Sequence, residues 1–182
     1  LLTLYEVFSG AYTSFQGPIN VSGALGTSTR DIYSGLLTNY GTGIGNVTNP
    51  YAAQTVSIPT KDGTYSNPYI WIRRANIMLK HIDEPACTDQ ERLHLEAIAR
   101  FFRAYCHYAL MINYGDVIYV DHLLDDASPE LTKARDSRLY VADQIYKELD
   151  WCIKNIQDDL AEPNTLNSDV VKAFMSRFTL FE

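Results

Sequence analysis

The chain contains 182 residues, of which 46% are hydrophobic and 20% are charged, and its formal net charge is −7. This composition is typical of a globular domain with a hydrophobic core, and the acidic charge, with no basic cluster longer than Arg73-Arg74, argues against a nucleic-acid groove. No apolar run approaches the ~20 residues that a membrane-spanning helix requires.

The first predicted helix lies near residues 2–14, where apolar side chains recur at helical spacing. After it, Gln16–Asn67 shows neither a helical nor a strand period and is rich in Gly, Ser, Thr, Asn and Tyr. Connections this long within a compact domain are uncommon and are usually functional or disordered. Because the stretch combines low charge with several tyrosines, we interpret it as an ordered, functional excursion. We call it the long excursion.

A second helix is predicted near residues 68–83, with Asn67 as its N-cap and Pro68 at its first position. Pro85 ends it. We interpret Asn76, on this helix, as a buried polar group that bonds a neighbouring loop. The predicted buried face consists of Ile72, Ala75, Leu79 and Ile82.

The third helix, near residues 88–114, has the clearest signals. Thr88 and Glu91 form a capping box at its start, and Gly115 can take the positive φ that ends a helix. Its apolar face consists of Leu95, Ile98, Phe102, Tyr105, Ala109 and Ile112. Its opposite face consists of Glu96, Arg100, Arg103 and His107. We expect Arg100 and Arg103 to be structural and partly buried beside carboxylates, because exposed ion pairs contribute only ~0–1 kcal/mol.

The rest of the chain predicts a strand-like run at residues 117–120, an acidic loop at 121–130 and two further helices. The fourth helix lies near residues 137–160, begins at Asp136 or Ser137, and packs through Ala142, Ile145, Leu149, Cys152, Ile156 and Leu160. The last lies near residues 169–182, is capped by Ser168, and holds Val171, Phe174, Phe178 and Leu180. We expect one shared core that contains Phe102, Tyr105, Ala109, Leu149 and Ile156.

Several of these segments, in this order, resemble motifs of the SusD/RagB family, the outer-membrane nutrient-binding lipoproteins of Bacteroidetes. The run from Ala99 to Val117 resembles the signature helix of that family and the Y-G-D-V turn that follows it. The run from Tyr69 to Asn76 is similar to its Y-x-x-I-x-x-A-N helix. The runs from Arg135 to Leu149 and from Val170 to Leu180 resemble its next two helices.

The resemblance implies an all-α fold of tetratricopeptide-like helix pairs, with the long excursion between the first two helices. The 34-residue tetratricopeptide consensus itself is absent, so the helix pairing is implied by the family rather than by a repeat. The resemblance also implies that residues 1–182 are the N-terminal helical part of a longer SusD-like domain, whose C-terminal part is absent from this chain.

By the same resemblance, the protein binds a glycan or another nutrient at the bacterial cell surface and is not an enzyme. The implied partners are an oligosaccharide or other nutrient ligand and a SusC-like TonB-dependent outer-membrane transporter, to which the ligand is delivered. The implied location is the outer membrane, as a surface-exposed lipoprotein. The family's signal peptide and lipid-anchoring Cys are not in this chain, and no cofactor is implied.

The candidate ligand-binding residues are Arg30, Asp31, Tyr33 and Tyr65, all in the long excursion. Sugars bind to aromatic platforms flanked by a few planar polar groups. Arg30, Asp31 and Tyr33 offer a donor, an acceptor and a ring within four residues, and Tyr65 supplies a second ring. The aromatic rings and the net charge of −7 lead us to expect a neutral or weakly charged oligosaccharide.

The sequence contains no constellation that we identify as catalytic or metal-binding. Its four histidines show no known metal spacing, and no nucleophile or phosphate-binding motif is present. The cysteines are too far apart for a disulfide framework, and we expect Cys106 and Cys152 to be buried free thiols. The alternative function is a tetratricopeptide-type scaffold for protein–protein interaction, against which the long excursion counts.

Overall fold

The computed structural model describes residues 60–84, 86–162 and 165–182. Within these ranges the chain forms four α-helices, α4 (Gly63–Lys80), α5 (Asp89–Tyr114), α6 (Arg138–Asn155) and α7 (Ser168–Phe181). Two short 3-10 helices, η2 (Pro129–Leu131) and η3 (Asp158–Leu160), lie in the connections, and the described residues form no β-strand. The predicted all-α class is therefore confirmed. The predicted helix at 2–14 and residues 16–59 of the long excursion lie outside the described residues.

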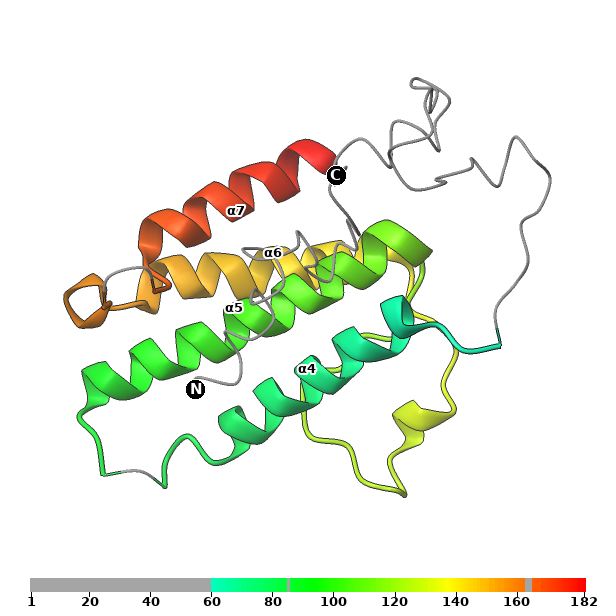
Figure 1. Ribbon diagram of the computed structural model, residues 1–182, viewed down its shortest axis with the longest axis horizontal. Coiled ribbons are helices and arrows are strands. Elements are labelled where there is room, and N and C mark those ends of the chain that lie inside the picture. The colour runs from blue at the N-terminus through cyan, green and yellow to red at the C-terminus, as the bar shows by residue number, and fades with distance from the viewer. Residues whose placement is uncertain (1–59, 85, 163–164) are drawn as a thin grey trace, which may run out of the picture. The chain divides into compact units, whose positions relative to one another are not determined.

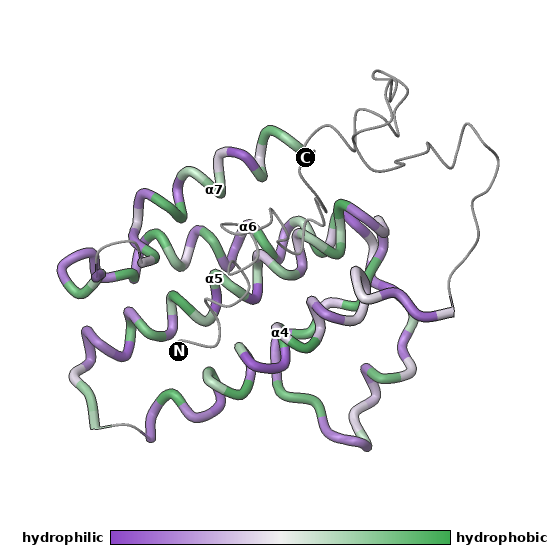
Figure 2. Tube along the Cα trace, in the orientation of Figure 1, coloured by the Kyte–Doolittle hydropathy of each residue, from purple (hydrophilic) through white to green (hydrophobic). Residues whose placement is uncertain are grey.

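Helix α5 is the central helix of the compact unit to which Tyr65–Glu182 belong. Figure 1 shows it between α4 and α6, with α7 alongside α6. Fourteen of its 26 residues are buried, so it is covered on more than the single apolar face that its sequence predicts. Hydrophobic and hydrophilic residues alternate along α6 and α7 in Figure 2, as expected for helices that bury one face.

The predicted shared core is confirmed at four of its five positions. The buried residues are Phe102, Ala109, Leu149 and Ile156. Tyr105 is only partly buried, because it lies at the α7 edge of α5, where its ring contacts Phe174 with centroids 5.3 Å apart. This partial burial raises the pKa of Tyr105 to about 12.

Helix α4 begins four residues before the predicted N-cap. The Thr64 N–H donates to Asp62 Oδ1 at 2.9 Å, which is the interaction of an N-cap aspartate. Asn67 is therefore not the cap, and Pro68 lies inside the helix rather than at its first position. A proline removes one backbone hydrogen bond at that point, which the buried position of Pro68 helps to offset. The last residues of the predicted long excursion are consequently helical.

The predicted ends of α5 are confirmed. The Thr88 N–H donates to Glu91 Oε2 at 2.7 Å, and the Glu91 N–H donates to Thr88 Oγ1 at 3.3 Å, which completes the capping box. Gly115 has a φ of 70°, and its N–H donates to Met111 O at 2.9 Å. A glycine adopts this positive φ without the steric cost that a Cβ would add.

The boundaries of the last two helices differ from the prediction. Ser137 does cap α6, since its Oγ accepts the Tyr140 N–H, but the helix ends at Asn155, and Leu160 lies outside it and is 40% exposed. The cap of α7 is Asn167 rather than Ser168, because the Ser168 hydroxyl instead donates to Asp158. Leu180, predicted to pack inward, is 86% exposed.

The predicted strand-like run at 117–120 is extended but forms no strand. Its one β-bridge joins Val117 to Asp136, and Val117, Tyr119 and Val120 are buried. No neighbouring strand is available within the described residues, so side chains of α4, of α5 and of the loop before α6 bond to its backbone groups instead. Among the described helices, none combines the length and apolar character needed to cross a bilayer.

Candidate functional site

A buried polar cluster joins three helices and consists of Asn76, Arg103, His107 and Glu148. Arg103 is 4% exposed, and its Nη2 donates to Glu148 Oε2 at 2.7 Å while its Nη1 donates to Asn76 Oδ1 at 2.8 Å. The other carboxylate oxygen of Glu148 accepts from Arg100 Nη1 at 3.1 Å. The prediction that Arg100 and Arg103 are structural and partly buried beside carboxylates is thus confirmed.

His107 occupies the face of α5 that was predicted to be polar, but this face is buried and His107 is 0% exposed. Its Nδ1 lies 3.0 Å from Arg103 O, and its Nε2 accepts the Val120 N–H at 3.2 Å. These two bonds require a neutral ring with its proton on Nδ1. Burial, helped by the charge of the nearby Arg103 and opposed by the hydrogen bond to Arg103 O, lowers the pKa of His107 to about 3.

The segment after α5 is fixed against α4 by two further side chains. Asn76 Nδ2 donates to His122 O at 2.8 Å, which confirms that Asn76 bonds a neighbouring loop. The Tyr69 hydroxyl donates to Ile118 O at 3.0 Å and accepts the Ile118 N–H at 3.2 Å. Burial raises the pKa of Tyr69, so the phenol stays protonated and keeps both bonds. Residues 118–122 are therefore held in one conformation.

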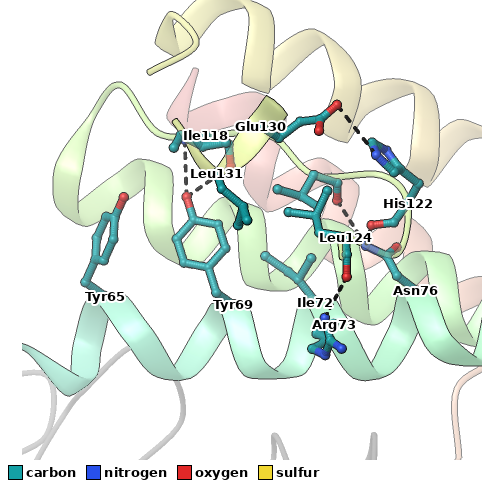
Figure 3. Close-up of a pocket in the computed structure, with 11 residues that line it drawn as sticks. Tyr65, Tyr69, Ile72, Arg73, Asn76, Ile118, His122, Leu124, Glu130 and Leu131 are labelled. Atoms are coloured by element: carbon teal, nitrogen blue, oxygen red, sulfur yellow. Dashed lines mark hydrogen bonds and ion pairs between the residues drawn. The ribbon is translucent and has the colours of Figure 1, made fainter. Parts of the chain in front are cut away.

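Between α4 and this segment lies a pocket of ≈ 310 Å³. Figure 3 shows its walls, with α4 on one side and the segment that runs from Ile118 through η2 on the other. Most of the lining is apolar. The lining residues are Tyr65, Tyr69, Ile72, Arg73, Asn76, Ile118, Val120, His122, Leu124, Glu130 and Leu131. Its volume falls within the range of small-molecule sites, at the low end. We therefore take this pocket as the candidate functional site.

Tyr65 is the only one of the four predicted site residues that the structure describes. It lies in the first turns of α4, one helical turn before Tyr69, with their ring centroids 5.3 Å apart. Its ring also meets Tyr114 edge-on at 5.0 Å, so it is held from two sides and remains partly exposed. Arg30, Asp31 and Tyr33 lie outside the described residues, and their part in a site stays a prediction.

Polar groups are few at the pocket. Arg73 Nη1 donates to Leu124 O at 2.9 Å. His122 Nδ1 lies 2.8 Å from Asp121 Oδ1, while its Nε2 is 3.6 Å from Glu130 Oε1. Partial burial acts to raise the pKa of Asp121, but the hydrogen bond from His122 and the charge of Arg103 outweigh it, and the net shift is downward.

Most of these lining residues were not predicted from the sequence to belong to a site. The spacing of Tyr65, Tyr69 and Arg73 is a period of four, which places all three on one face of a helix, but the predicted start at Pro68 hid this relation. His122, Glu130 and Leu131 lie in what was predicted to be an acidic loop. Nothing in their local pattern indicates that α4 lies opposite them.

Other side chains that could be reactive have structural roles. Cys106 and Cys152 are buried free thiols, as predicted, and burial raises the pKa of both. Within the described ranges no group of three or more His, Cys, Asp or Glu side chains is placed to hold a metal ion.

The sequence model of the SusD-like family described as starch-binding and associating with the outer membrane matches residues 26–180. No curated protein matches the chain.

Solved SusD-like proteins share the fold. One from Bacteroides fragilis superimposes with a TM-score of 0.61 at 20% identity, over 66% of this chain and 24% of its own. A laminarin-binding SusD-like protein gives 0.65 at 18% identity, over 100% of this chain and 40% of its own. A SusD-like carbohydrate-binding protein from Bacteroides vulgatus gives 0.63 at 16% identity, over 98% and 41%. The chain thus spans from 24% to 41% of the length of these structures.

Proposed function

Because the chain belongs to the SusD-like family of starch-binding proteins that associate with the outer membrane, we propose that it binds carbohydrate and does not convert it. The family match over residues 26–180 is the observation that carries this proposal. The laminarin bound by one protein of the same fold is a neutral glucan, which supports an oligosaccharide of low charge as the ligand.

The residues proposed to contact the ligand are Tyr65 and, in the long excursion, Arg30, Asp31 and Tyr33. Tyr65 suits this role because Tyr69 and Tyr114 hold its ring from two sides. A ring fixed in this way loses little conformational entropy when a sugar stacks on it. Arg30 and Asp31 would supply the donors and acceptors that sugar hydroxyls require.

The protein is expected at the outer membrane, as a lipoprotein exposed at the cell surface. There it would pass its ligand to a SusC-like TonB-dependent transporter. The support is the association with the outer membrane in the family's description and the origin of the similar structures in Bacteroides. Co-purification of the transporter with the tagged full-length protein from outer membranes tests this part of the proposal.

Binding is tested by a glycan array on the full-length protein, followed by calorimetry. Each stacked ring contributes on the order of 1 kcal/mol, so Tyr65→Ala and Tyr33→Ala should each weaken binding about fivefold, and the double variant should nearly abolish it. Tyr140→Ala, at an exposed tyrosine of α6, is the matched control. Unchanged affinity in both single variants would move the site elsewhere, and a peptide ligand in place of a glycan would favour the scaffold alternative.

A further inference from the structure

The walls of the pocket are poorly suited to a bare sugar. Ile72, Leu124 and Leu131 are aliphatic, and two of the polar side chains beside them are already engaged. The Tyr69 hydroxyl makes both of its bonds to Ile118, and Asn76 is bonded at its amide nitrogen and at its oxygen. A sugar ring placed here would leave several hydroxyls without partners, at a cost of about 1–3 kcal/mol each. An apolar group incurs no such cost.

The size of the pocket matches an aromatic group. A dry apolar cavity of about 150 Å³ holds a benzene ring, and this pocket has ≈ 310 Å³. An aromatic ring with a short side arm therefore fits within it. The Tyr65 and Tyr69 rings line the same space and offer the edge-to-face contacts that aromatic rings prefer.

One polar group on the wall lacks a partner. Glu130 Oε2 is buried and has no hydrogen-bond donor within the described part of the chain. Its other oxygen lies 3.6 Å from His122 Nε2, which is longer than a hydrogen bond. A buried carboxylate oxygen without a donor favours a ligand that brings an O–H group. Figure 3 shows Glu130 and His122 at one end of the pocket.

We propose that this pocket receives a phenolic acyl group, such as a hydroxycinnamoyl ester, carried by the glycan ligand. The inference rests on the proposed function, since it makes the pocket a second recognition element beside the sugar-stacking Tyr65. The aliphatic walls take the ring, and Glu130 accepts from the phenol. The guanidinium of Arg73, fixed on Leu124 O, has further N–H groups that can donate to the ester carbonyl.

The ester linkage is part of the proposal. With the phenol at Glu130, the acyl carbonyl lies at the exposed Arg73, where the ester oxygen can continue into the glycan outside the pocket. The ligand is therefore an acylated glycan whose ring lies in the pocket and whose sugars lie outside it.

The test uses calorimetry on the full-length protein with four probes. They are a feruloylated arabinoxylo-oligosaccharide, the same oligosaccharide after saponification, methyl ferulate and ferulic acid. Burial of the ring should make the feruloylated oligosaccharide bind about tenfold or more tightly than the saponified one, and methyl ferulate and ferulic acid should each bind at the pocket without a sugar. Leu131→Trp, at a lining residue that is 55% exposed, should remove this preference by filling the pocket. Leu139→Trp, at an exposed residue of α6 outside the pocket, should leave it unchanged.

A second variant tests the carboxylate. In the parent protein the feruloylated probe should bind more tightly than its cinnamoyl counterpart, which has no phenol, by about tenfold. Glu130→Gln keeps the shape of the side chain but removes its charge, so this advantage should shrink. The binding of the saponified oligosaccharide should not change.

The outcomes separate the two proposals. Equal affinity for the feruloylated and saponified oligosaccharides would overturn the acyl-group inference and leave glycan binding intact. A preference that survives in Leu131→Trp would also overturn it, because the ring would then lie elsewhere. Binding of methyl ferulate that is lost in Leu131→Trp would support the pocket whether or not the saponified oligosaccharide binds. No binding of any of these probes would overturn the acyl-group inference, while the glycan array tests the proposed function independently.

Discussion

The segment 118–122 has two sides that differ in how their polar groups are satisfied. On its inner side is the buried polar cluster, where Arg103, Asn76 and His107 bond to one another, to Glu148 or to the segment's backbone. Only Arg103 Nε lacks a partner there within the described residues. On its outer side the pocket has aliphatic walls and an unpaired Glu130 oxygen.

This difference separates a structural role from a binding role. Polar groups that bond to one another hold the segment in place and have no capacity left for a ligand. A polar group without a partner can still bond to a ligand, and an open apolar wall can still pack against one. The inner cluster therefore pre-organises the outer pocket. Because the segment is already ordered, ligand binding does not cost the conformational entropy of ordering it.

The largest expected effect distinguishes two arginines that lie on opposite sides of this segment. Arg103→Ala leaves Glu148 buried with only Arg100 as its partner, and it leaves Asn76 Oδ1 without a donor. Breaking a buried pair in this way should lower the free energy of unfolding by ~3–5 kcal/mol. Arg73→Ala, at the exposed side, should change it by no more than ~0.5 kcal/mol. Urea unfolding of the full-length protein measures both, and equal losses would contradict the distinction.

The burial of His107 lets us predict how the stability of the inner cluster depends on pH. Its pKa is about 3 in the folded state, against an ordinary value of 6.5. The unfolded chain therefore binds a proton that the folded chain excludes, and stability is full above pH 6.5 and is lost as the pH falls toward 3. This group contributes a slope of ~1.4 kcal/mol per pH unit within that window.

The control for this prediction removes the imidazole. His107→Gln should lower stability at neutral pH and should reduce the slope between pH 6 and pH 4.5 by about that amount. Other titrating groups are common to the parent and the variant, so the difference between their curves isolates His107. An unchanged slope in His107→Gln would mean that the ring is protonated in the folded state.

An intermediate effect is expected at Tyr69, which lies between the two regions. Tyr69→Phe keeps the ring as a pocket wall but removes both bonds to the Ile118 backbone. Stability should fall by ~1–2 kcal/mol, and the Ile118 amide should exchange with solvent faster. Tyr146→Phe, at an exposed tyrosine of α6, is the matched control. If the Ile118 amide exchanges equally slowly in both variants, Tyr69 does not fix the segment.

Most of the fold followed from local signals in the sequence. The capping box at Thr88 and the glycine at position 115 fixed the ends of α5, because caps act through backbone groups within one turn. The start of α4 was predicted wrongly because Asn67-Pro68 is as good a start signal as Asp62, and the tertiary environment of the buried Pro68 decided between them. The end of α6 at Asn155 was placed too late, and the cap of α7 was assigned one residue too late.

The site was less predictable because it depends on contacts between distant parts of the chain. Tyr65 was predicted from composition, but its neighbours across the pocket are more than 50 residues away along the chain. The charged face of α5 gave a partial signal. Its arginines predicted carboxylate partners, yet Glu148 and the complete burial of His107 depend on how α6 and the segment after α5 cover that face.

The smallest expected effect shows that burial, rather than distance, distinguishes the ion pairs. Lys154 Nζ lies 2.6 Å from Asp150 Oδ2, which is as close as Arg103 lies to Glu148 at 2.7 Å. The Lys154 and Asp150 side chains are 67% and 41% exposed, against 4% and 11% for the buried pair. Water screens the exposed charges, so Lys154→Ala should lower the free energy of unfolding by only ~0.3 kcal/mol. Added salt should abolish that small loss, whereas the loss in Arg103→Ala should persist. A loss above ~1 kcal/mol for Lys154→Ala would mean that proximity alone sets the strength of these pairs.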